Sequence, residues 1–201
     1  MTTRELKQTL RTHALATRNQ IPAQKHREWS DRIVKTVLAS KWYRQAPIVH
    51  CYHAIGSEVQ TRSFFEYAFD DDKIVLLPVI NPAIAVSLVH AHITPRTQYI
   101  YNKQGLPTPI TAEKMHSVAR EICTATTCII VPMVGFDDKL YRLGYGKGYY
   151  DAFLSGIPSK KIGIAFQSQI ITEIPCELHD VPLDMVITEE RIYTPQNVFT
   201  L

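Results

Sequence analysis

Several features that would place the chain in a special class are scarce or missing. No two of its four cysteines form a C-x-x-C pair, which argues against a cysteine zinc site or a disulfide framework, so we expect reduced, buried thiols. No apolar run approaches the roughly 20 residues that cross a bilayer. The polar N-terminal segment also lacks the apolar core of a signal peptide. We therefore expect a cytoplasmic protein with no membrane contact.

No charge of one sign dominates either. The chain has 22 Lys and Arg against 19 Asp and Glu, a formal net charge of +3, and it lacks a stripe of interleaved basic and aromatic residues. This balance suits an anionic small molecule, and we expect no nucleic-acid partner. The length of 201 residues fits one domain spanning residues 1–201. Because no coiled-coil or exposed apolar segment is evident, we expect a monomer.

Apolar, strand-like segments alternate with segments of helical periodicity. Helices are predicted over residues 3–19, 22–40, 62–69 and 112–122. Strands are predicted over residues 48–54, 73–80, 85–93, 127–134, 161–166 and 185–188. This alternation indicates an α/β fold of three layers, in which a mostly parallel, Rossmann-like sheet is flanked by helices, two of them N-terminal. Polar and apolar residues alternate over 85–101, which favours a small hairpin there instead.

Only eight glycines occur, yet Gly144, Gly146 and Gly148 fall on alternate positions. Glycines so spaced let successive backbone N–H groups converge on phosphate oxygens. The buried-strand pattern of residues 128–134 precedes them, and residues 149–154 can open a helix. No Ser or Thr follows the loop lysine, so the Walker pattern is missing, and the third glycine comes too early for the dinucleotide fingerprint. We expect a nucleoside triphosphate as the ligand.

Charged residues surround this loop. Arg142 and Lys147 supply positive charge that matches phosphate, and we assign both to catalysis. Asp151 follows the loop, where a carboxylate can hold Mg²⁺ that bridges phosphate oxygens. Lys7 and Arg11 lie four residues apart, so a helix places both on one face. On sequence grounds alone, a solvated basic face is the simpler explanation of that pair.

Four motifs follow one another along the chain: KQTLR at residues 7–11, GSEVQT at 56–61, VPMVGFD at 131–137 running into RLGYGKGYYD at 142–151, and HDVPLD at 179–184. In this order, together with Arg18, they resemble the motifs of the 5-formyltetrahydrofolate cyclo-ligases, also called methenyltetrahydrofolate synthetases. The resemblance extends from residue 7 to the region of residue 190. That family commonly has Glu where Thr108 stands, which leaves the role of Thr108 open.

The resemblance implies ATP- and Mg²⁺-dependent conversion of 5-formyltetrahydrofolate to 5,10-methenyltetrahydrofolate, with release of ADP and phosphate. It implies ATP contacts from Lys7, Arg11, Arg142, Leu143, Gly144, Tyr145, Gly146, Lys147, Gly148, Tyr149 and Tyr150. It implies folate contacts from Glu58, Tyr145 and Tyr150, and a Mg²⁺ site formed by Asp151 and Asp184. Without the resemblance, a helix cap or turn residue explains Glu58 equally well, and a turn residue is the simpler explanation of Asp184.

Other classes of function fit parts of the pattern. A non-catalytic relative of the same fold could bind nucleic acid or a protein partner through basic N-terminal helices, but it would not need Lys7, Arg11, Arg142, Asp151 and Asp184 together. A sugar-phosphate isomerase or acyl-transferase of similar architecture would explain the phosphate loop but not the N-terminal Lys and Arg.

The histidines at positions 50, 53, 90 and 92 invite a zinc interpretation. Structural zinc usually recruits cysteines at tight spacing, and catalytic zinc needs a third protein ligand that the sequence does not place. Exposed or capping histidines are the simpler interpretation.

Overall fold

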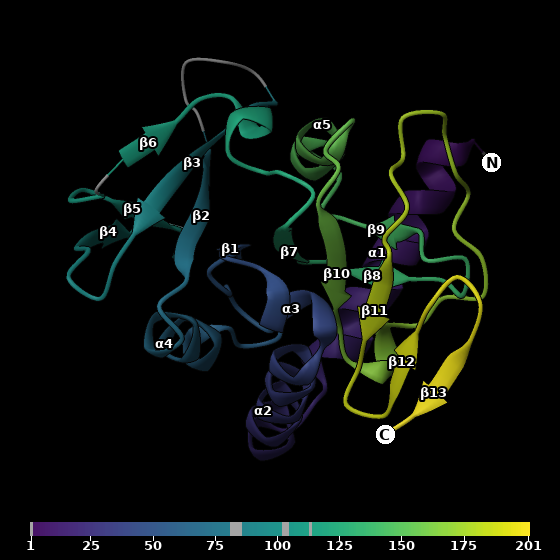
Figure 1. The fold of residues 1–201 in the computed structure, drawn as a ribbon. Helices are drawn as coiled ribbons and strands as arrows, with labels where there is room; N and C mark the ends of the chain where they lie inside the picture. Colours follow the sequence, from purple (N-terminus) through teal and green to yellow (C-terminus); the bar gives the residue numbers. More distant parts are fainter. Residues whose placement is uncertain (1, 81–85, 102–104, 113) are drawn as a thin grey trace.

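A mixed, nine-stranded sheet forms the centre of the molecule (Figure 1). The computed structural model describes residues 2–80, 86–101, 105–112 and 114–201. The strand order in the sheet is β13-β12-β11-β10-β7-β1-β2-β3-β6. Its middle five strands are parallel: β11 (Met185–Ile187), β10 (Lys160–Ile164), β7 (Thr127–Val131), β1 (Ile48–His50) and β2 (Ile74–Ile80). Antiparallel strands complete both edges: β12 (Arg191–Tyr193), β13 (Val198–Thr200), β3 (Leu88–Ile93) and β6 (Lys114–His116).

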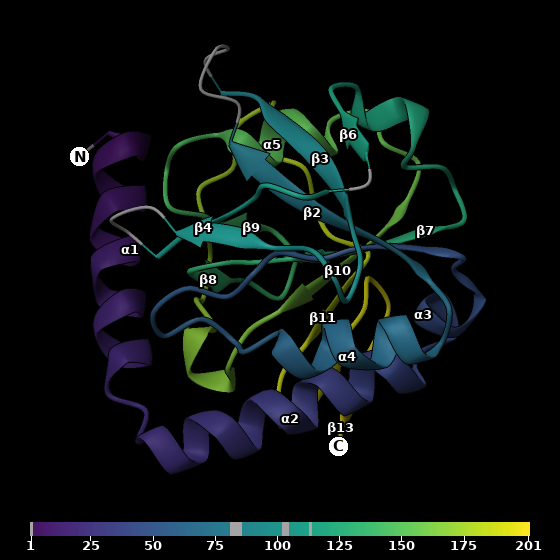
Figure 2. The ribbon, with the colours of Figure 1, turned by 90° about the vertical axis from the view of Figure 1, so that its left-hand side faces the viewer.

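Helices cover both faces of this sheet, as the sequence predicts. One face carries α2 (Ala23–Ala39), α3 (Lys41–Gln45) and α4 (Arg62–Asp70), and the other carries α5 (Tyr149–Leu154) and a 3-10 turn at Ala119–Glu121. Figure 2 shows α2 and α4 on one side of the sheet and α5 on the opposite side. The prediction of an α/β fold with a mainly parallel sheet is confirmed.

Strand β7 shows why the layers form. All five of its residues are buried, because alternate side chains point into two different apolar cores. Ile130 lies in the core beneath α2 and α4, whereas Ile129 lies in the core beneath α5. Helix α2 contributes a buried stripe of Ile33, Val34 and Val37, the spacing of an amphipathic helix.

The N-terminal helix α1 (Thr3–Asn19) stands apart from both layers (Figure 2). It begins with a capping box, in which the Thr2 side chain and the Glu5 side chain each accept a hydrogen bond from the other residue's backbone N–H. Ala14 and Arg18 are its buried residues. Since α1 adds little to the apolar cores, polar contacts determine its position.

Two small hairpins lie outside the main sheet. Strand β4 (Tyr99–Tyr101) pairs with β5 (Pro107–Pro109), and β8 (Gly135–Phe136) pairs with β9 (Arg142–Leu143). The expected small hairpin is therefore present, but its strands pair differently from the prediction for residues 85–101, of which residue 85 lies outside the described residues. β3 joins β2 and β6, whereas β4 joins β5, where Thr108 is exposed opposite Ile100.

The helix predicted over residues 112–122 is wrong. Residue 113 lies outside the described residues, and the rest of the segment forms strand β6 and the 3-10 turn. β6 pairs with the edge strand β3, with Met115 opposite Ala91. Ladder hydrogen bonds at an open sheet edge outweigh a modest local helix preference in so short a segment. No helix among the described residues has the length and apolarity needed to cross a bilayer.

Burial in the central sheet predicts how much two isoleucines contribute to the free energy of unfolding. Ile130 is fully buried in β7, so Ile130→Ala leaves a cavity and should lower the free energy of unfolding by about 2–5 kcal/mol. Ile74, at the start of β2, is 42% exposed, and Ile74→Ala should cost within about 1 kcal/mol. Urea denaturation measures both. Equal losses would contradict this layer arrangement.

Candidate active site

The order of the parallel strands creates a crevice at their carboxyl ends. Strands β1 and β7 are neighbours, but the chain leaves β1 towards β2 on one side and leaves β7 towards β10 on the other. Ligand sites in open α/β sheets lie at such a change of direction. The segment after β1 carries Glu58, and the segment after β7 leads through β8 and β9 to the glycine loop.

The glycine loop, residues 144–148, needs its glycines at two positions. Gly146 has φ +85° and Gly148 has φ +74°, a region that other residues adopt only with strain. A Cβ atom on Gly146 would also lie 3.2 Å from Cζ of Arg11. Gly144 has neither constraint, since its φ is not in this region and no atom lies within 4 Å of an added Cβ.

Helix α1 holds this loop through Arg11. The Nε atom of Arg11 donates a hydrogen bond to the Gly144 carbonyl at 2.7 Å, and burial lowers the pKa of Arg11 from its usual value. The loop itself offers one unengaged cation: within the described part of the chain, Lys147 is exposed and makes no hydrogen bond or ion pair. Leu143 is buried beneath the loop, and Tyr149 is half-buried at the start of α5.

Arg142 is buried, and protein groups occupy its guanidinium. Its Nη2 atom donates to Oδ1 of Asp151 at 2.7 Å, and its Nη1 atom donates to the Val181 carbonyl at 3.1 Å. Its side chain is 3% exposed. Charge-assisted hydrogen bonds of this kind are strong, so Arg142 ties the start of α5 to the segment before β11.

Lys7 reaches from α1 to that same segment. Its Nζ atom contacts Oδ2 of Asp180 at 2.7 Å and Oε2 of Glu177 at 2.8 Å. Burial opposes the charge on Lys7, but the two carboxylates outweigh burial and raise its pKa. Burial likewise opposes the charge on Asp180, yet Lys7 and the Glu177 backbone N–H outweigh it and lower the pKa of Asp180. Asp180 is therefore ionised at neutral pH.

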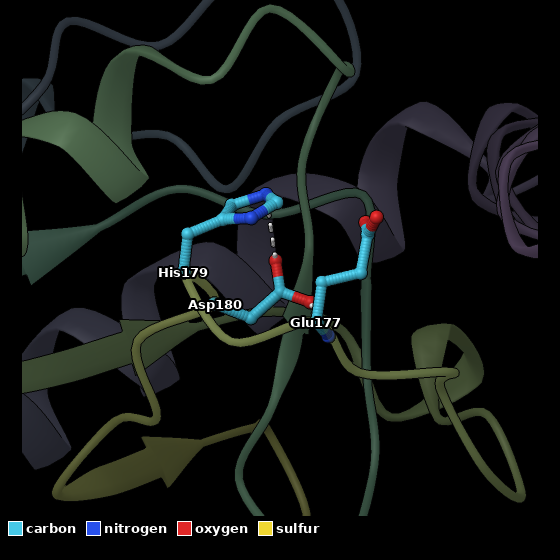
Figure 3. A group of neighbouring side chains, drawn as sticks. All are labelled: Glu177, His179 and Asp180. Atoms are coloured by element: carbon cyan, nitrogen blue, oxygen red, sulfur yellow. Dashed lines mark hydrogen bonds and ion pairs between the residues drawn. The ribbon is translucent and has the colours of Figure 1, made fainter.

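Asp180, Glu177 and His179 form a compact group of metal-ligating side chains (Figure 3). Their ligand atoms all lie within 4.8 Å of one another. His179 approaches Oδ1 of Asp180 with its Nε2 atom at 3.9 Å. The motif HDVPLD contains two acids, and the sequence alone offered no reason to prefer Asp180, because its contact with Lys7 spans 173 residues.

Asp184, the acid expected beside Asp151, lies elsewhere. Its Oδ2 atom accepts a hydrogen bond from the Lys161 backbone N–H at 2.9 Å, and its Oδ1 atom lies 3.4 Å from Nζ of Lys160. These lysines begin β10, so Asp184 lies at the amino ends of the parallel strands, whereas the glycine loop follows their carboxyl ends. The structure does not bring Asp184 together with Asp151.

The segment after β1 meets the glycine loop through Glu58 and Tyr145. Glu58 is 5% exposed, and burial raises its pKa although the Ile55 N–H, Arg18 and Tyr145 act in the opposite direction. The Tyr145 hydroxyl accepts a hydrogen bond from Arg18 and lies close enough to the Glu58 carboxylate to lower its pKa, while Tyr145 as a whole is 45% exposed. A ligand in the crevice can therefore contact the Tyr145 ring without displacing its hydroxyl.

Tyr150 lies on the inner side of the same region. Its hydroxyl is buried and has no hydrogen-bond partner among the described residues. Burial raises the pKa of Tyr150 well above its usual value, and the nearby carboxylate of Glu58 adds to the shift. A buried hydroxyl without a partner is costly, so a ligand group that pairs with it would gain free energy.

The histidines do not assemble a zinc site. His50 and His90 are both buried and share a hydrogen bond between Nε2 and Nδ1 at 2.9 Å, with both rings against Phe153. Among the described residues, the group of three metal-ligating side chains within reach of one ion is the one that contains Asp180. The buried histidine pair belongs to the packing beneath α5.

Comparison with known proteins decides the class of this site. A family model described as the 5-formyltetrahydrofolate cyclo-ligase family matches residues 3–189. The chain belongs to this cyclo-ligase family. It is 34% identical over 79% of its length to a probable 5-formyltetrahydrofolate cyclo-ligase of Schizosaccharomyces pombe, of which it covers 82%. It is 27% identical over 88% of its length to the 5-formyltetrahydrofolate cyclo-ligase of Haemophilus influenzae, of which it covers 94%.

Solved structures agree with this family. The chain matches the NMR structure of Aquifex aeolicus 5,10-methenyltetrahydrofolate synthetase with a TM-score of 0.79 and 25% identity, over 98% of this chain and 96% of that one. The predicted enzyme class is confirmed: the chain is an ATP-dependent cyclo-ligase of folate one-carbon metabolism. The matches are to enzymes over most of the chain, which leaves the non-catalytic alternative without support.

The glycine loop provides a matched pair of variants of this cyclo-ligase. Gly146→Ala places an L residue at φ +85° against Arg11, a strain of roughly 1–2 kcal/mol. We expect kcat/KM for ATP to fall about tenfold, because 1.4 kcal/mol corresponds to a factor of ten. Gly144→Ala meets no neighbouring atom and should remain near wild type. Equal effects in steady-state assays would contradict the loop geometry.

Proposed function

We propose that the crevice above β1 and β7 catalyses ATP- and Mg²⁺-dependent closure of 5-formyltetrahydrofolate to 5,10-methenyltetrahydrofolate. The observation that carries this proposal is the contact of Arg11 with the glycine loop, on the same helix whose Lys7 pairs with Asp180. Glu58 lies on the other side of Tyr145. Cations and backbone N–H groups for phosphates thus adjoin a buried carboxylate suited to a folate ring.

The reaction needs no protein nucleophile. The formyl oxygen of the substrate attacks the γ-phosphorus of ATP, the bond to the bridging oxygen breaks, and ADP leaves. N10 of the folate then attacks the formyl carbon and loses its proton to solvent. The carbon–oxygen bond breaks, and phosphate departs with the former formyl oxygen. In such a phosphoryl transfer the protein contributes positioning and charge neutralisation.

The glycine loop and the cations around it bind the phosphates. Lys147 is exposed on the loop, and Lys7 and Arg11 approach from α1. Preorganised cations and N–H groups stabilise charge that develops on the transferred phosphoryl oxygens. Arg142 adds its charge from beneath the loop and holds Asp151 in place. Leu143, Tyr149 and Tyr150 would form the walls of the nucleotide side.

The carboxylates fit a magnesium ion. Asp180, with Glu177 beside it, and Asp151 at the start of α5 would present the hard oxygen ligands that Mg²⁺ takes together with substrate phosphates. Both aspartates are paired with cations, Arg142 and Lys7, so Mg²⁺ would bind them together with phosphates that take over as partners of those cations. When bound, Mg²⁺ would neutralise charge on the phosphates. Asp184 is not part of this proposal, because it lies at the opposite ends of the strands.

The substrate side centres on Glu58. A carboxylate that accepts a hydrogen bond from the Ile55 N–H on one oxygen keeps acceptor capacity for the amino and ring N–H donors of a pterin. Tyr145 offers an exposed ring for stacking, and the buried Tyr150 hydroxyl offers an unused hydrogen-bonding group. These three residues support 5-formyltetrahydrofolate as the substrate.

The direct test is absorbance of the methenyl product. Purified protein is mixed with 5-formyltetrahydrofolate and ATP, with Mg²⁺ or with EDTA. We expect a rise that requires both ATP and Mg²⁺, with one ADP released per methenyl group. A folded protein that gives no rise would contradict the proposed function, and a rise that persists in EDTA would contradict the magnesium assignment alone.

The choice between the two acids of the late motif can be tested separately. Asp180→Asn removes a carboxylate beside Lys7, and we expect the apparent affinity for Mg²⁺ to fall at least roughly 10–100-fold. Asp184→Asn changes an acid of the same motif at the other end of the strands, and its Mg²⁺ dependence should match wild type. Initial rates over a Mg²⁺ series give both values. The reverse result would restore Asp184 to the metal site.

A further inference from the structure

The buried guanidinium of Arg18 joins three segments of the crevice. Its Nε atom donates to Oγ of Ser57 at 2.9 Å, its Nη1 atom donates to the Met133 carbonyl at 3.3 Å, and its Nη2 atom donates to the Tyr145 hydroxyl at 2.9 Å. Ser57 follows β1, Met133 follows β7, and Tyr145 lies in the glycine loop. One side chain, 3% exposed, thus contacts three of the segments that build the site.

The contact continues through Tyr145 to Glu58. The Tyr145 hydroxyl accepts a hydrogen bond from Arg18 and lies near the Glu58 carboxylate, whose pKa it lowers. Tyr145 belongs to the nucleotide loop, whereas Glu58 belongs to the segment that we assign to folate. The hydrogen bonds of Arg18 therefore link α1 both to the glycine loop, through Tyr145, and to the substrate side, through Ser57.

The energetics of burial make these contacts interdependent. A buried charge is costly unless its donors are paired, and the planar guanidinium fixes the relative positions of its partners. Tyr145 lies between two glycines, so the loop that carries it can move when a nucleotide binds. Any movement of its hydroxyl changes the pairing of Arg18, and through Arg18 the position of Ser57.

We propose that Arg18 is a positioning residue that couples the nucleotide side of the site to the folate side. When the glycine loop closes on ATP, Tyr145 and Arg18 set the segment of Ser57 and Glu58 in its folate-binding position. This inference rests on the proposed function. It concerns the effect of nucleotide binding on folate binding, because the guanidinium donates hydrogen bonds to protein groups on both sides.

A purely structural brace predicts something different. If Arg18 only anchors α1, its removal lowers stability and weakens both ligands alike, and the effect of one ligand on the other is unchanged. Coupling between sites is instead measured as the factor by which one ligand tightens the other. The ratio of two dissociation constants therefore separates the two roles.

The experiment is calorimetric titration of 5-formyltetrahydrofolate, with and without a non-hydrolysable ATP analogue and Mg²⁺. In wild type we expect the analogue to tighten folate binding about 5-fold or more, within the usual range of coupling.

In Arg18→Met this factor should fall towards one. Tyr145→Phe keeps the ring and removes the hydroxyl, so it should lower the factor as well, even if Arg18→Met folds poorly. Arg27→Met, at an exposed position of α2, is the matched control and should keep the wild-type factor.

The outcomes are distinct. A factor near one in wild type, or a wild-type factor in both Arg18→Met and Tyr145→Phe, would overturn the coupling role while cyclo-ligase activity stands. Failure of folded wild-type protein to bind either ligand would overturn the proposed function and this inference with it.

Discussion

The position of α1 across the carboxyl ends of the parallel strands is the constraint on which the site depends. Lys7, Arg11 and Arg18 project from it within about 40° of one another around the helix, since each residue turns the helix by roughly 100°. Lys7 contacts the region of Asp180, Arg11 contacts the glycine loop, and Arg18 contacts that loop and the segments after β1 and β7. Without α1 these segments would be four separate loops of the sheet.

Charge pairing explains why the site is stable before ligands arrive. Asp151 is paired with Arg142, and Asp180 is paired with Lys7. Removing one partner of a buried pair leaves an uncompensated charge, which is strongly destabilising. A magnesium–triphosphate complex carries both signs of charge, so it can satisfy the carboxylates and the cations at the same time. The two ion pairs therefore hold the charged side chains in place until the Mg²⁺ and the phosphates of the ligand become their partners.

Much of this arrangement follows from the sequence. The alternation of elements predicts the parallel sheet, and the three glycines with their flanking charges predict a phosphate loop. The four motifs identify the family, and Arg11 of the first motif contacts the glycine loop of the third. These features are local, or they depend on the carboxyl ends of parallel strands meeting at one edge.

What the sequence could not supply depends on distant contacts. Asp180 and Asp184 are equivalent acids in one motif, and only the ion pair with Lys7, 173 residues away, distinguishes them. The central place of Arg18 requires Tyr145, 127 residues away. The segment of β6 has helical character by itself and becomes a strand because β3 offers an open edge. In each case tertiary geometry decides between local alternatives.

The central claim is that nucleotide binds between α1 and the glycine loop, at the carboxyl ends of the strands. Backbone amide shifts in an ¹⁵N NMR titration with a non-hydrolysable ATP analogue and Mg²⁺ test it most directly. Binding at this place should give the largest shifts at Gly144, Gly146, Gly148 and Asp180. Largest shifts at Lys160, Lys161 and Asp184, with the glycine loop unchanged, would contradict it.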